Sequence, residues 1–373
     1  MKWLFWISAA LVAYSYLGYP LWLWLRSWWS PRPVLRGPIE PAVSVAMVVR
    51  NEEATLSAKL NNLFGLDYPP GKLQIVVISD GSEDGTAAIL QKLKDHPQLR
   101  FLLKTESQGK AAGLGDALKI ASGEIVFFTD ARQHIELGAL RCLIENFADP
   151  SVGCASGELM LGQPGSGETG RGMGLYWRIE KKVRELESAS SSVAGATGAI
   201  YCARRALLEP PPPGTILDDV LLPMQVVRKG SRVIFDSRAR AWDQPDLGHK
   251  REFARKVRTL SGNYQLLQLA PWLLSGKNAI RFEFISHKLL RLVVPFALLA
   301  LFVSSLFLPQ PVYRMALVAQ IIFYGLSLVA MLGVNIGPLS RIADPARTFV
   351  VLNSAALVAF VNFVTGKKAI WVR

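Results

Sequence analysis

The chain has 373 residues and a net charge of +13, and half of its residues are hydrophobic while only 19% are charged. This apolar fraction is too high for an ordinary soluble protein, and the excess lies at the two ends of the chain. The positive charge would suit a nucleic-acid-binding protein, but no nucleic-acid-binding module is recognisable, and a domain held against anionic lipid carries the same bias. The composition therefore excludes a soluble enzyme and indicates an integral membrane protein that contacts lipid and no nucleic acid.

Four long stretches contain no charged residue and are predicted to cross a membrane. They cover residues 3–25, 292–308, 315–340 and 348–365. About 20 apolar residues span a bilayer, so the first and third stretches are long enough and the other two are adequate. The first is rich in aromatic residues and shows no small-residue cleavage site, which favours an anchor over a signal peptide. We expect an N-terminal transmembrane helix at 1–29 and about three C-terminal ones within 289–373.

Basic residues predict the orientation of these spans. Only Lys2 precedes the first span, whereas Arg26, Arg32 and Arg36 follow it. Positive residues favour the cytoplasmic side, so the middle region is expected in the cytoplasm, at a bacterial inner membrane. The basic C-terminal tail disagrees, because four complete spans would place it outside. Either the last segment is re-entrant or interfacial, or one predicted span is wrong.

The middle region alternates between strand and helix patterns. After a proline-rich linker, short unbroken apolar runs predict strands buried on both faces, with helical patterns between them. The predicted strands cover 43–49, 73–79, 99–103, 125–128 and 152–161, and the predicted helices cover 54–63, 87–94 and 111–121. A further strand is predicted later in the chain, at 232–236. Such alternation predicts an α/β domain with a parallel, doubly wound sheet. We assign the linker to 30–41, the domain to 42–270 and an interfacial helix to 271–288, and we expect the glycine-rich stretch 162–172 to be a mobile loop.

Polar clusters follow three of the predicted strands. They are RNEE (50–53), DGSEDGT (80–86) and TDARQ (129–133). Each alone has a plain explanation as a helix start or a turn. Right-handed crossovers, however, bring the carboxyl ends of parallel strands to one edge of the sheet, where such sheets bind ligands. Together with Lys110, which enters the same edge, the three clusters predict a ligand crevice.

Two segments later in the chain have charged residues close together. Asp218 and Asp219 open a predicted helix, where carboxylates are favoured by the helix dipole whatever their function. The helix at 250–259 is basic, with Arg255 and Arg258 on one face, and a helix lying on a membrane surface would look the same. The residues alone leave these alternatives open.

These motifs, in this order, resemble family 2 glycosyltransferases with a GT-A fold, in the membrane-bound branch that includes cellulose, hyaluronan and poly-N-acetylglucosamine synthases. The matching segments are VSVAMVVRNEE, LQIVVISDGSEDGT, QGKAAGLGDALKIASGEIVFFTDARQ, TILDDVLLPMQVVRKG and RKVRT, within 42–265. The resemblance implies a Rossmann-like, mostly parallel sheet in the cytoplasm, with transmembrane helices at both ends. It also implies an inverting hexosyltransferase that uses a nucleotide-sugar donor, expected to be a UDP-sugar, and a glycan or lipid-linked acceptor.

The resemblance also implies residues for the donor. Glu52 and Asp80 are expected to hold the uridine, and Lys110 is expected near the nucleotide. Asp130 matches the first Asp of the DxD motif, beside the ribose and a metal-bound diphosphate, but Arg132 stands in place of the second Asp. A cofactor of Mg²⁺ or Mn²⁺ with Asp130 as its protein ligand remains the expectation, since phosphate oxygens and water can complete the shell. Alternatively, Arg132 pairs with phosphate directly.

Catalysis and phosphate binding are assigned by the same resemblance. Asp219 matches the general base, and Asp218 is its positioning neighbour. Arg255 and Arg258 match a Q/R-x-x-R-W segment in which the Arg binds diphosphate and the Trp stacks on the acceptor sugar. Thr259 replaces that Trp, so acceptor stacking at this place is lost, which weakens the expectation of a cellulose-like acceptor channel.

Three functions compete at this level. A processive polysaccharide synthase would extrude its product, and about four spans would then require a homo-oligomer or polysaccharide-assembly partners. A second possibility is the transfer of one sugar to a lipid carrier or short glycan. A third is a catalytically degenerate nucleotide-sugar sensor or scaffold, supported by Arg132 and Thr259.

Overall fold

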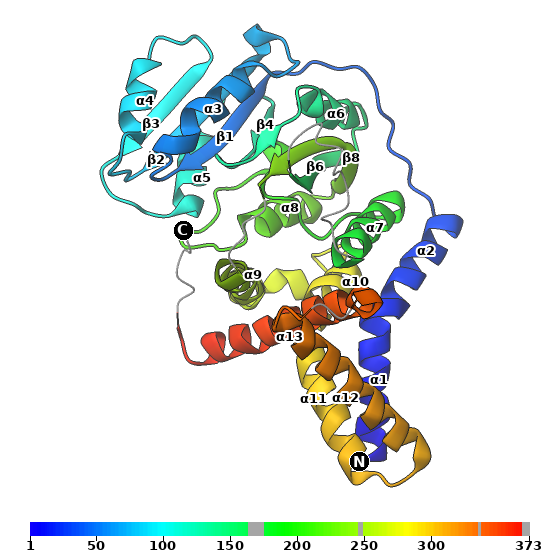
Figure 1. Cartoon of the computed structure of the whole chain (residues 1–373). Helices are drawn as coiled ribbons and strands as arrows, with labels where there is room; N and C mark the ends of the chain where they lie inside the picture. The colour runs from blue at the N-terminus through cyan, green and yellow to red at the C-terminus, as the bar shows by residue number, and fades with distance from the viewer. Residues whose placement is uncertain (163–174, 245–248, 335–336, 368–373) are drawn as a thin grey trace.

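The computed structural model describes residues 1–162, 175–244, 249–334 and 337–367. Nearly all of the glycine-rich stretch predicted to be a mobile loop lies outside these ranges. An α/β domain stands on a stem formed by helices α1, α11 and α12 (Figure 1). The helices are α1 Lys2–Ala13, α2 Tyr19–Trp29, α3 Glu53–Phe64, α4 Thr86–Lys92, α5 Lys110–Ile120, α6 Ala139–Glu145, α7 Leu175–Ser190, α8 Asp218–Arg228, α9 His249–Leu269, α10 Arg281–Phe284, α11 Leu290–Phe307, α12 Pro311–Met331 and α13 Ser340–Val364.

The domain is built on one mixed sheet, which has eight strands in the described residues, in the order β3-β2-β1-β4-β7-β6-β8-β5. The strands are β1 Val43–Val49, β2 Leu73–Asp80, β3 Leu99–Lys104, β4 Ile125–Phe128, β5 His134–Ile135, β6 Val152–Leu161, β7 Tyr201–Arg204 and β8 Arg232–Asp243. The first four pair in parallel. Strand β7 is antiparallel to both of its neighbours, and β5 is antiparallel to β8. The expectation of a mostly parallel sheet therefore describes the first half, and the whole sheet is mixed.

The strand β1 explains how the sheet is buried on both sides. All seven of its residues are buried, and successive side chains of a strand point to opposite faces. Val45 and Met47 join a hydrophobic cluster with α3 and α6. Ala46 and Val48 join a second cluster with α5 and α8 on the other face. The continuous apolar run in the sequence follows from these two cores.

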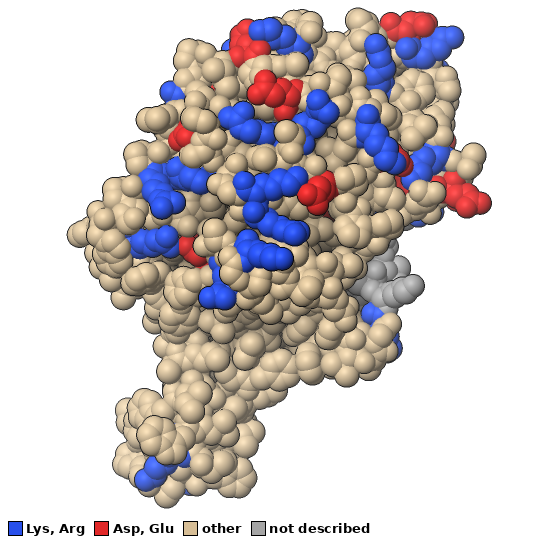
Figure 2. All heavy atoms as spheres, turned by 180° about the vertical axis from the view of Figure 1, so that it is seen from behind, with Lys and Arg blue, Asp and Glu red and all other residues tan. Residues whose placement is uncertain are grey.

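Four helical segments are long and apolar enough to cross a membrane. They are Lys2–Trp29, Arg281–Phe307, Pro311–Met331 and Ser340–Val364. Many of their large apolar side chains are exposed, as expected for surfaces that face lipid. Figure 2 shows Lys, Arg, Asp and Glu gathered on the domain, while the visible face of the stem carries almost none. The chain therefore has the composition and build of an integral membrane protein.

The last of these segments, α13, does not run along the stem. It lies across the domain-side end of the stem (Figure 1) and packs against α9. Val257 of α9 is buried with Ala355 and Ala359 of α13, and Tyr264 stacks on Phe363 with ring centroids 5.0 Å apart. Of the two explanations for the basic tail, this arrangement favours an interfacial last segment.

The stretch expected to be one interfacial helix over 271–288 is divided. A short 3₁₀ turn covers Pro271–Leu274. A separate helix begins at α10 and continues through a π-helical turn into α11. Asn278 lies between the two pieces, where its side chain donates to the carbonyl of Leu273 at 2.8 Å and accepts from the backbone of Ile280 at 3.1 Å. These bonds fix a turn in place of a continuous helix.

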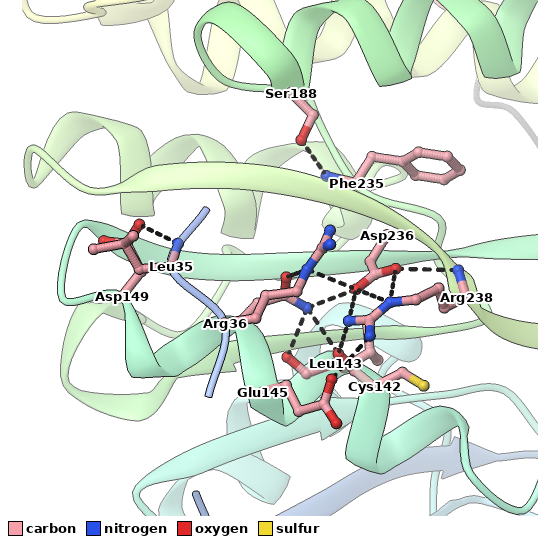
Figure 3. A network of polar contacts seen from close by, with 11 residues as sticks. Leu35, Arg36, Cys142, Leu143, Glu145, Asp149, Ser188, Phe235, Asp236 and Arg238 are labelled. Atoms are coloured by element: carbon pink, nitrogen blue, oxygen red, sulfur yellow. Dashed lines mark hydrogen bonds and ion pairs between the residues drawn. The ribbon is translucent and has the colours of Figure 1, made fainter. Parts of the chain in front are cut away.

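The linker 30–41 is fastened to the domain (Figure 3). The backbone N–H of Leu35 donates to Asp149 at 3.3 Å, and Arg36 donates to the side-chain oxygen of Asn146 at 3.0 Å. Asn146 in turn donates to Asp236 at 2.9 Å, and Asp236 also forms an ion pair with Arg36 at 3.7 Å. The linker is thus a strap along the edge formed by α6 and β8.

Candidate active site

An ion triad joins three elements of the domain. Lys110, the first residue of α5, places its ammonium 2.9 Å from Asp130, which follows β4, and 3.3 Å from Asp218, which opens α8. Burial alone would lower the pKa of Lys110, but the two carboxylates outweigh it and raise that pKa. The sheet edge predicted to bind a ligand therefore holds a firmly charged lysine.

Asp219 lies beside this triad against a backbone of small residues. A Cβ on Gly198 would come within 3.0 Å of the carboxylate of Asp219, and the backbone N–H of Ala196 donates to the carbonyl of Asp219 at 2.7 Å. Burial and the charge of Asp218 raise the pKa of Asp219 to about 6, while Lys110 opposes the rise. Such a carboxylate is suited to accept a proton near neutral pH.

Arg258 approaches the same carboxylates from α9. Burial lowers the pKa of Arg258, whereas the charges of Asp218, Asp219 and Asp130 raise it. The guanidinium therefore lies within the electrostatic influence of all three acids. Arg255 lies nearly one turn earlier on the same helix and is exposed. We call Lys110, Asp130, Asp218, Asp219 and Arg258 the active-site cluster.

Asp80 is connected to this cluster through a loop. Its carboxylate is fully buried and accepts hydrogen bonds from Ser107 Oγ at 2.7 Å, Gln108 N at 2.9 Å and Gly109 N at 2.8 Å. Burial opposes ionisation, but these bonds hold the pKa of Asp80 below its ordinary value. Asp80 thus fixes the residues immediately before Lys110. Its predicted contact with the nucleotide stays a prediction.

The loops after β1 and β2 meet, as the motif positions predict. Asn51, at φ 55°, accepts a hydrogen bond from the backbone of Glu83 at 2.8 Å and donates its own N–H to Ser82 at 3.1 Å. Next to it, Glu52 accepts a hydrogen bond from Thr55 at 2.7 Å. Glu52 therefore lies at the shared edge, and its role in holding the nucleotide remains a prediction.

Arg132 points to a partner outside the DxD-like motif. It lies 3.3 Å from Asp243 at the end of β8, and Gln133 donates to the same carboxylate at 2.9 Å. Within the described residues, no group of three His, Cys, Asp or Glu side chains could hold a metal ion. These residues therefore provide too few ligands to hold a cation without the help of a substrate. Asp130 offers one carboxylate, 38% exposed.

Sequence reasoning missed Lys59, which supports the loop that carries Asp130. Its buried ammonium donates to Thr129 Oγ1 at 2.9 Å and to the carbonyl of Gln133 at 2.7 Å. Burial lowers the pKa of Lys59 to about 7, with the charge of Asp130 opposing. The signal was present, because Lys59 falls on the apolar face of α3 among buried leucines.

Tyr201 was also missed. Its ring stacks on Phe128 with centroids 4.5 Å apart, and its buried hydroxyl has no hydrogen-bond partner among the described residues. Burial, followed by the charges of Asp218 and Asp219, raises the pKa of Tyr201. The hydroxyl therefore keeps its proton and is oriented within the field of the active-site cluster.

Comparisons with known proteins agree with this geometry. The family model "Glycosyl transferase family 2" matches residues 44–209. Beta-monoglucosyldiacylglycerol synthase of Synechocystis sp. is 27% identical over 171 residues, which are 45% of this chain and 36% of that protein. Poly-beta-1,6-N-acetyl-D-glucosamine synthase of Staphylococcus aureus is 34% identical over 116 residues, which are 31% of this chain and 28% of that protein. The matches thus span about a third of the length of these curated relatives.

A solved structure resembles the chain over nearly its whole length. It is the mannosyltransferase PcManGT from Pyrobaculum calidifontis in complex with GDP-Man and Mn²⁺, with a TM-score of 0.73 and 25% identity. The likeness covers 98% of this chain and 99% of that one, so it includes the membrane helices as well as the sheet. Residues 44–209 therefore match glycosyltransferase family 2, within a GT-A-like domain that has candidate membrane helices on both sides of it in the chain.

Proposed function

We propose that the chain is an inverting glycosyltransferase that moves a sugar from a nucleotide-sugar donor to a hydroxyl of a glycan or lipid-linked acceptor. The observation that carries this proposal is the neighbourhood of Asp219. A carboxyl group with a pKa of about 6 lies beside Lys110 and Arg258, which are cationic. A proton acceptor next to groups that stabilise negative charge is what a direct displacement at a sugar carbon requires.

In the proposed reaction, each of these residues has a separate role. Asp219 takes the proton of the acceptor hydroxyl while that oxygen forms a bond to the anomeric carbon. The bond from this carbon to the phosphate oxygen breaks, and the nucleoside diphosphate leaves with the electron pair. Lys110 and Arg258 stabilise the charge that develops on the leaving diphosphate. Asp218, 3.3 Å from the ammonium of Lys110, holds that ammonium in position.

We assign a divalent cation to Asp130, arriving with the donor. Mg²⁺ is commonly held by one or two carboxylates together with substrate phosphates, and the single, partly exposed carboxylate of Asp130 fits that mode. When bound, the cation would neutralise diphosphate charge. The mannosyltransferase of similar structure is described with Mn²⁺. Activity in membranes should therefore disappear with EDTA and return with Mn²⁺ or Mg²⁺.

We place the domain on the cytoplasmic side. Arg26 and Arg32 mark the domain-side end of the first span, and positive residues favour the cytoplasm. The position of α13 across the stem supports a C-terminus on the same side (Figure 1). Labelling of single cysteines introduced near Lys2 and near Arg100 from each side of intact cells would test this orientation, and labelling of the Arg100 site from outside would contradict it.

The donor is tested by a panel of UDP-sugars and GDP-sugars. The motifs favour uridine, whereas the similar mannosyltransferase is described with GDP-Man, so both series belong in the panel. We expect one donor to release nucleotide in membranes that contain the protein, and Asp219→Asn to abolish the release while the donor still binds. Binding of a donor without any release would support the sensor or scaffold instead. Product length would separate processive synthesis from single transfer.

A further inference from the structure

A cavity of about 270 Å³ lies between the end of the first span and the domain. Its polar lining comprises Arg26, Arg32, Arg232, Ser191, Ser192 and Ser231. It is separate from the active-site cluster and shares no residue with it. Three arginines and three hydroxyls around one cavity provide hydrogen-bond donors in excess and an unusual concentration of positive charge.

Two of the arginines form no ion pair among the described residues. Arg26 forms an ion pair with Glu283 at 2.5 Å. Within the described residues, neither Arg32 nor Arg232 lies within ion-pair distance of a carboxylate. Arg232 donates to the backbone carbonyls of Arg32 at 2.8 Å, Ser188 at 3.0 Å and Ser191 at 3.2 Å. These carbonyls orient the guanidinium, and the charge of Asp149 acts on it only from beyond ion-pair distance.

The two free charges also act on each other. Burial lowers the pKa of Arg232 and the charge of Asp149 raises it, while the charge of Arg32, the smallest of the three effects, lowers it. Arg32 is held near Arg232 because its backbone N–H, within the strap, donates to the carbonyl of Ala189 at 2.7 Å. Two like charges held together beside a cavity favour an anionic ligand.

The cavity lies where two candidate membrane segments meet the domain. Arg26 is in the last turn of α2, and Ile280, also in the lining, immediately precedes α10. The cavity therefore sits where two membrane segments reach the domain. Trp28 and Trp29, at the end of the first segment, are exposed, and exposed tryptophans at this position mark a membrane interface.

We propose that this cavity binds the phosphate of an anionic phospholipid headgroup, with Arg32 and Arg232 as its charged contacts. Its volume is just below the range of about 300–1,000 Å³ that holds whole small molecules. It therefore accommodates a headgroup whose acyl chains stay in the bilayer. Anionic lipids of the cytoplasmic leaflet attract basic groups near the membrane surface, and here that attraction is concentrated in one cavity.

The test measures lipid binding to the full-length protein in detergent, with fluorescent phosphatidylglycerol as the probe. Unlabelled phosphatidylglycerol, phosphatidylcholine and inorganic phosphate serve as competitors. We expect phosphatidylglycerol to displace the probe at least tenfold more effectively than either of the others. Equal competition by phosphatidylcholine would show that acyl chains alone drive binding, and equal competition by inorganic phosphate would show a site for soluble anions. Either result would overturn the proposal.

Substitutions of single arginines test whether the lipid binds in this cavity. Arg32→Gln is the cleaner change, because Arg32 uses its backbone in the observed hydrogen bonds while Arg232 uses its side chain. We expect Arg32→Gln to weaken phosphatidylglycerol binding at least tenfold, and Arg32→Lys to retain part of it. The matched control is Arg100→Gln on β3, an exposed arginine that loses the same charge far from the cavity. Equal effects of Arg32→Gln and Arg100→Gln would reject the site, whatever sugar the enzyme transfers.

Discussion

Two charge clusters in this molecule differ in how their acidic residues are stabilised. The active-site cluster holds three acids with Lys110 and Arg258. The second, which we call the seam cluster, joins the domain to the membrane helices and consists of Glu180 and Glu187 of α7 with Arg184, His287 and Arg291. His287 lies 2.8 Å from Glu187 and 3.1 Å from Glu180, and Arg291 lies 2.8 Å from Glu180.

The difference lies in how well each acid is neutralised. Burial would raise the pKa of Glu180, but Arg291, His287 and Arg184 hold it well below the ordinary value. Burial and Asp218 instead raise the pKa of Asp219 to about 6. The seam cluster surrounds Glu180 with basic partners and is suited to join structural parts. The active-site cluster keeps one acid poised near neutral pH, which is typical of groups that move protons.

The largest expected effect is on turnover. Asp219→Asn keeps the shape of the side chain but removes the proton acceptor, so kcat should fall by about 10²–10⁴-fold. Steady-state assays of nucleotide release would measure it, together with donor binding by calorimetry, which should stay unchanged. Asp95→Asn, at an exposed acid in the same domain, is the control. Near-wild-type turnover would remove Asp219 from the mechanism.

Substitutions in the seam cluster should lower the stability of the protein and leave its turnover unchanged. Glu180→Gln leaves Arg291 and His287 buried with too little negative charge, and breaking a buried pair costs about 3–5 kcal/mol. Denaturant unfolding in detergent would measure the loss. Glu185→Gln, an acid on the same helix whose partner is Lys182, should change stability by no more than about 0.5 kcal/mol. If Glu180→Gln instead abolished turnover at full stability, the contrast between the clusters would fail.

Lys110 sharpens the comparison because it belongs to the active-site cluster and also carries structural ion pairs. Lys110→Met removes one group that stabilises the leaving diphosphate, for which we expect a loss in kcat of about 10²-fold. Lys119→Met, on the exposed face of the same helix, should leave kcat unchanged. A loss confined to thermal stability would assign Lys110 to the fold alone.

The smallest effect concerns pH. Asp219 must be ionised to act, so kcat/KM should fall as the pH drops through about 6. The charge of Lys288 lowers the pKa of Asp219, so Lys288→Gln should move this acidic limb to higher pH while the plateau changes little. Rates measured from pH 5 to 8 in both proteins would show the shift. An identical limb in both would separate Lys288 from the catalytic carboxyl.

The sequence was informative where burial alone decides structure. Strands β1, β4 and β6 begin and end at the predicted residues. For β1 and β4 the reason is that their apolar runs are buried on both faces and polar residues follow them. It was less informative for β8, which extends to Asp243 beyond the predicted strand. Its later residues alternate between buried and exposed, and they pair with strands distant in the chain.

For the active-site residues too, the sequence predicted some contacts and gave no sign of others. The motif positions predicted that Lys110, Asp130, Asp218 and Arg258 would gather, and the structure places them together. The pairing of Arg132 with Asp243 joins residues 111 positions apart, and no local pattern indicates it. The direction of α13 depends on its contacts with α9, so composition alone predicted a further span of the stem.

The strap formed by residues 30–41 sets how far the reaction lies from the bilayer. Hydrogen bonds to the domain leave this segment little slack, so the catalytic carboxyl cannot drift toward or away from the lipid surface as it would on a loose tether. Under the proposed function, an acceptor anchored in the membrane would therefore have to present its hydroxyl at one fixed height. The enzyme would then select acceptors by the length of the group that separates their reactive end from the lipid.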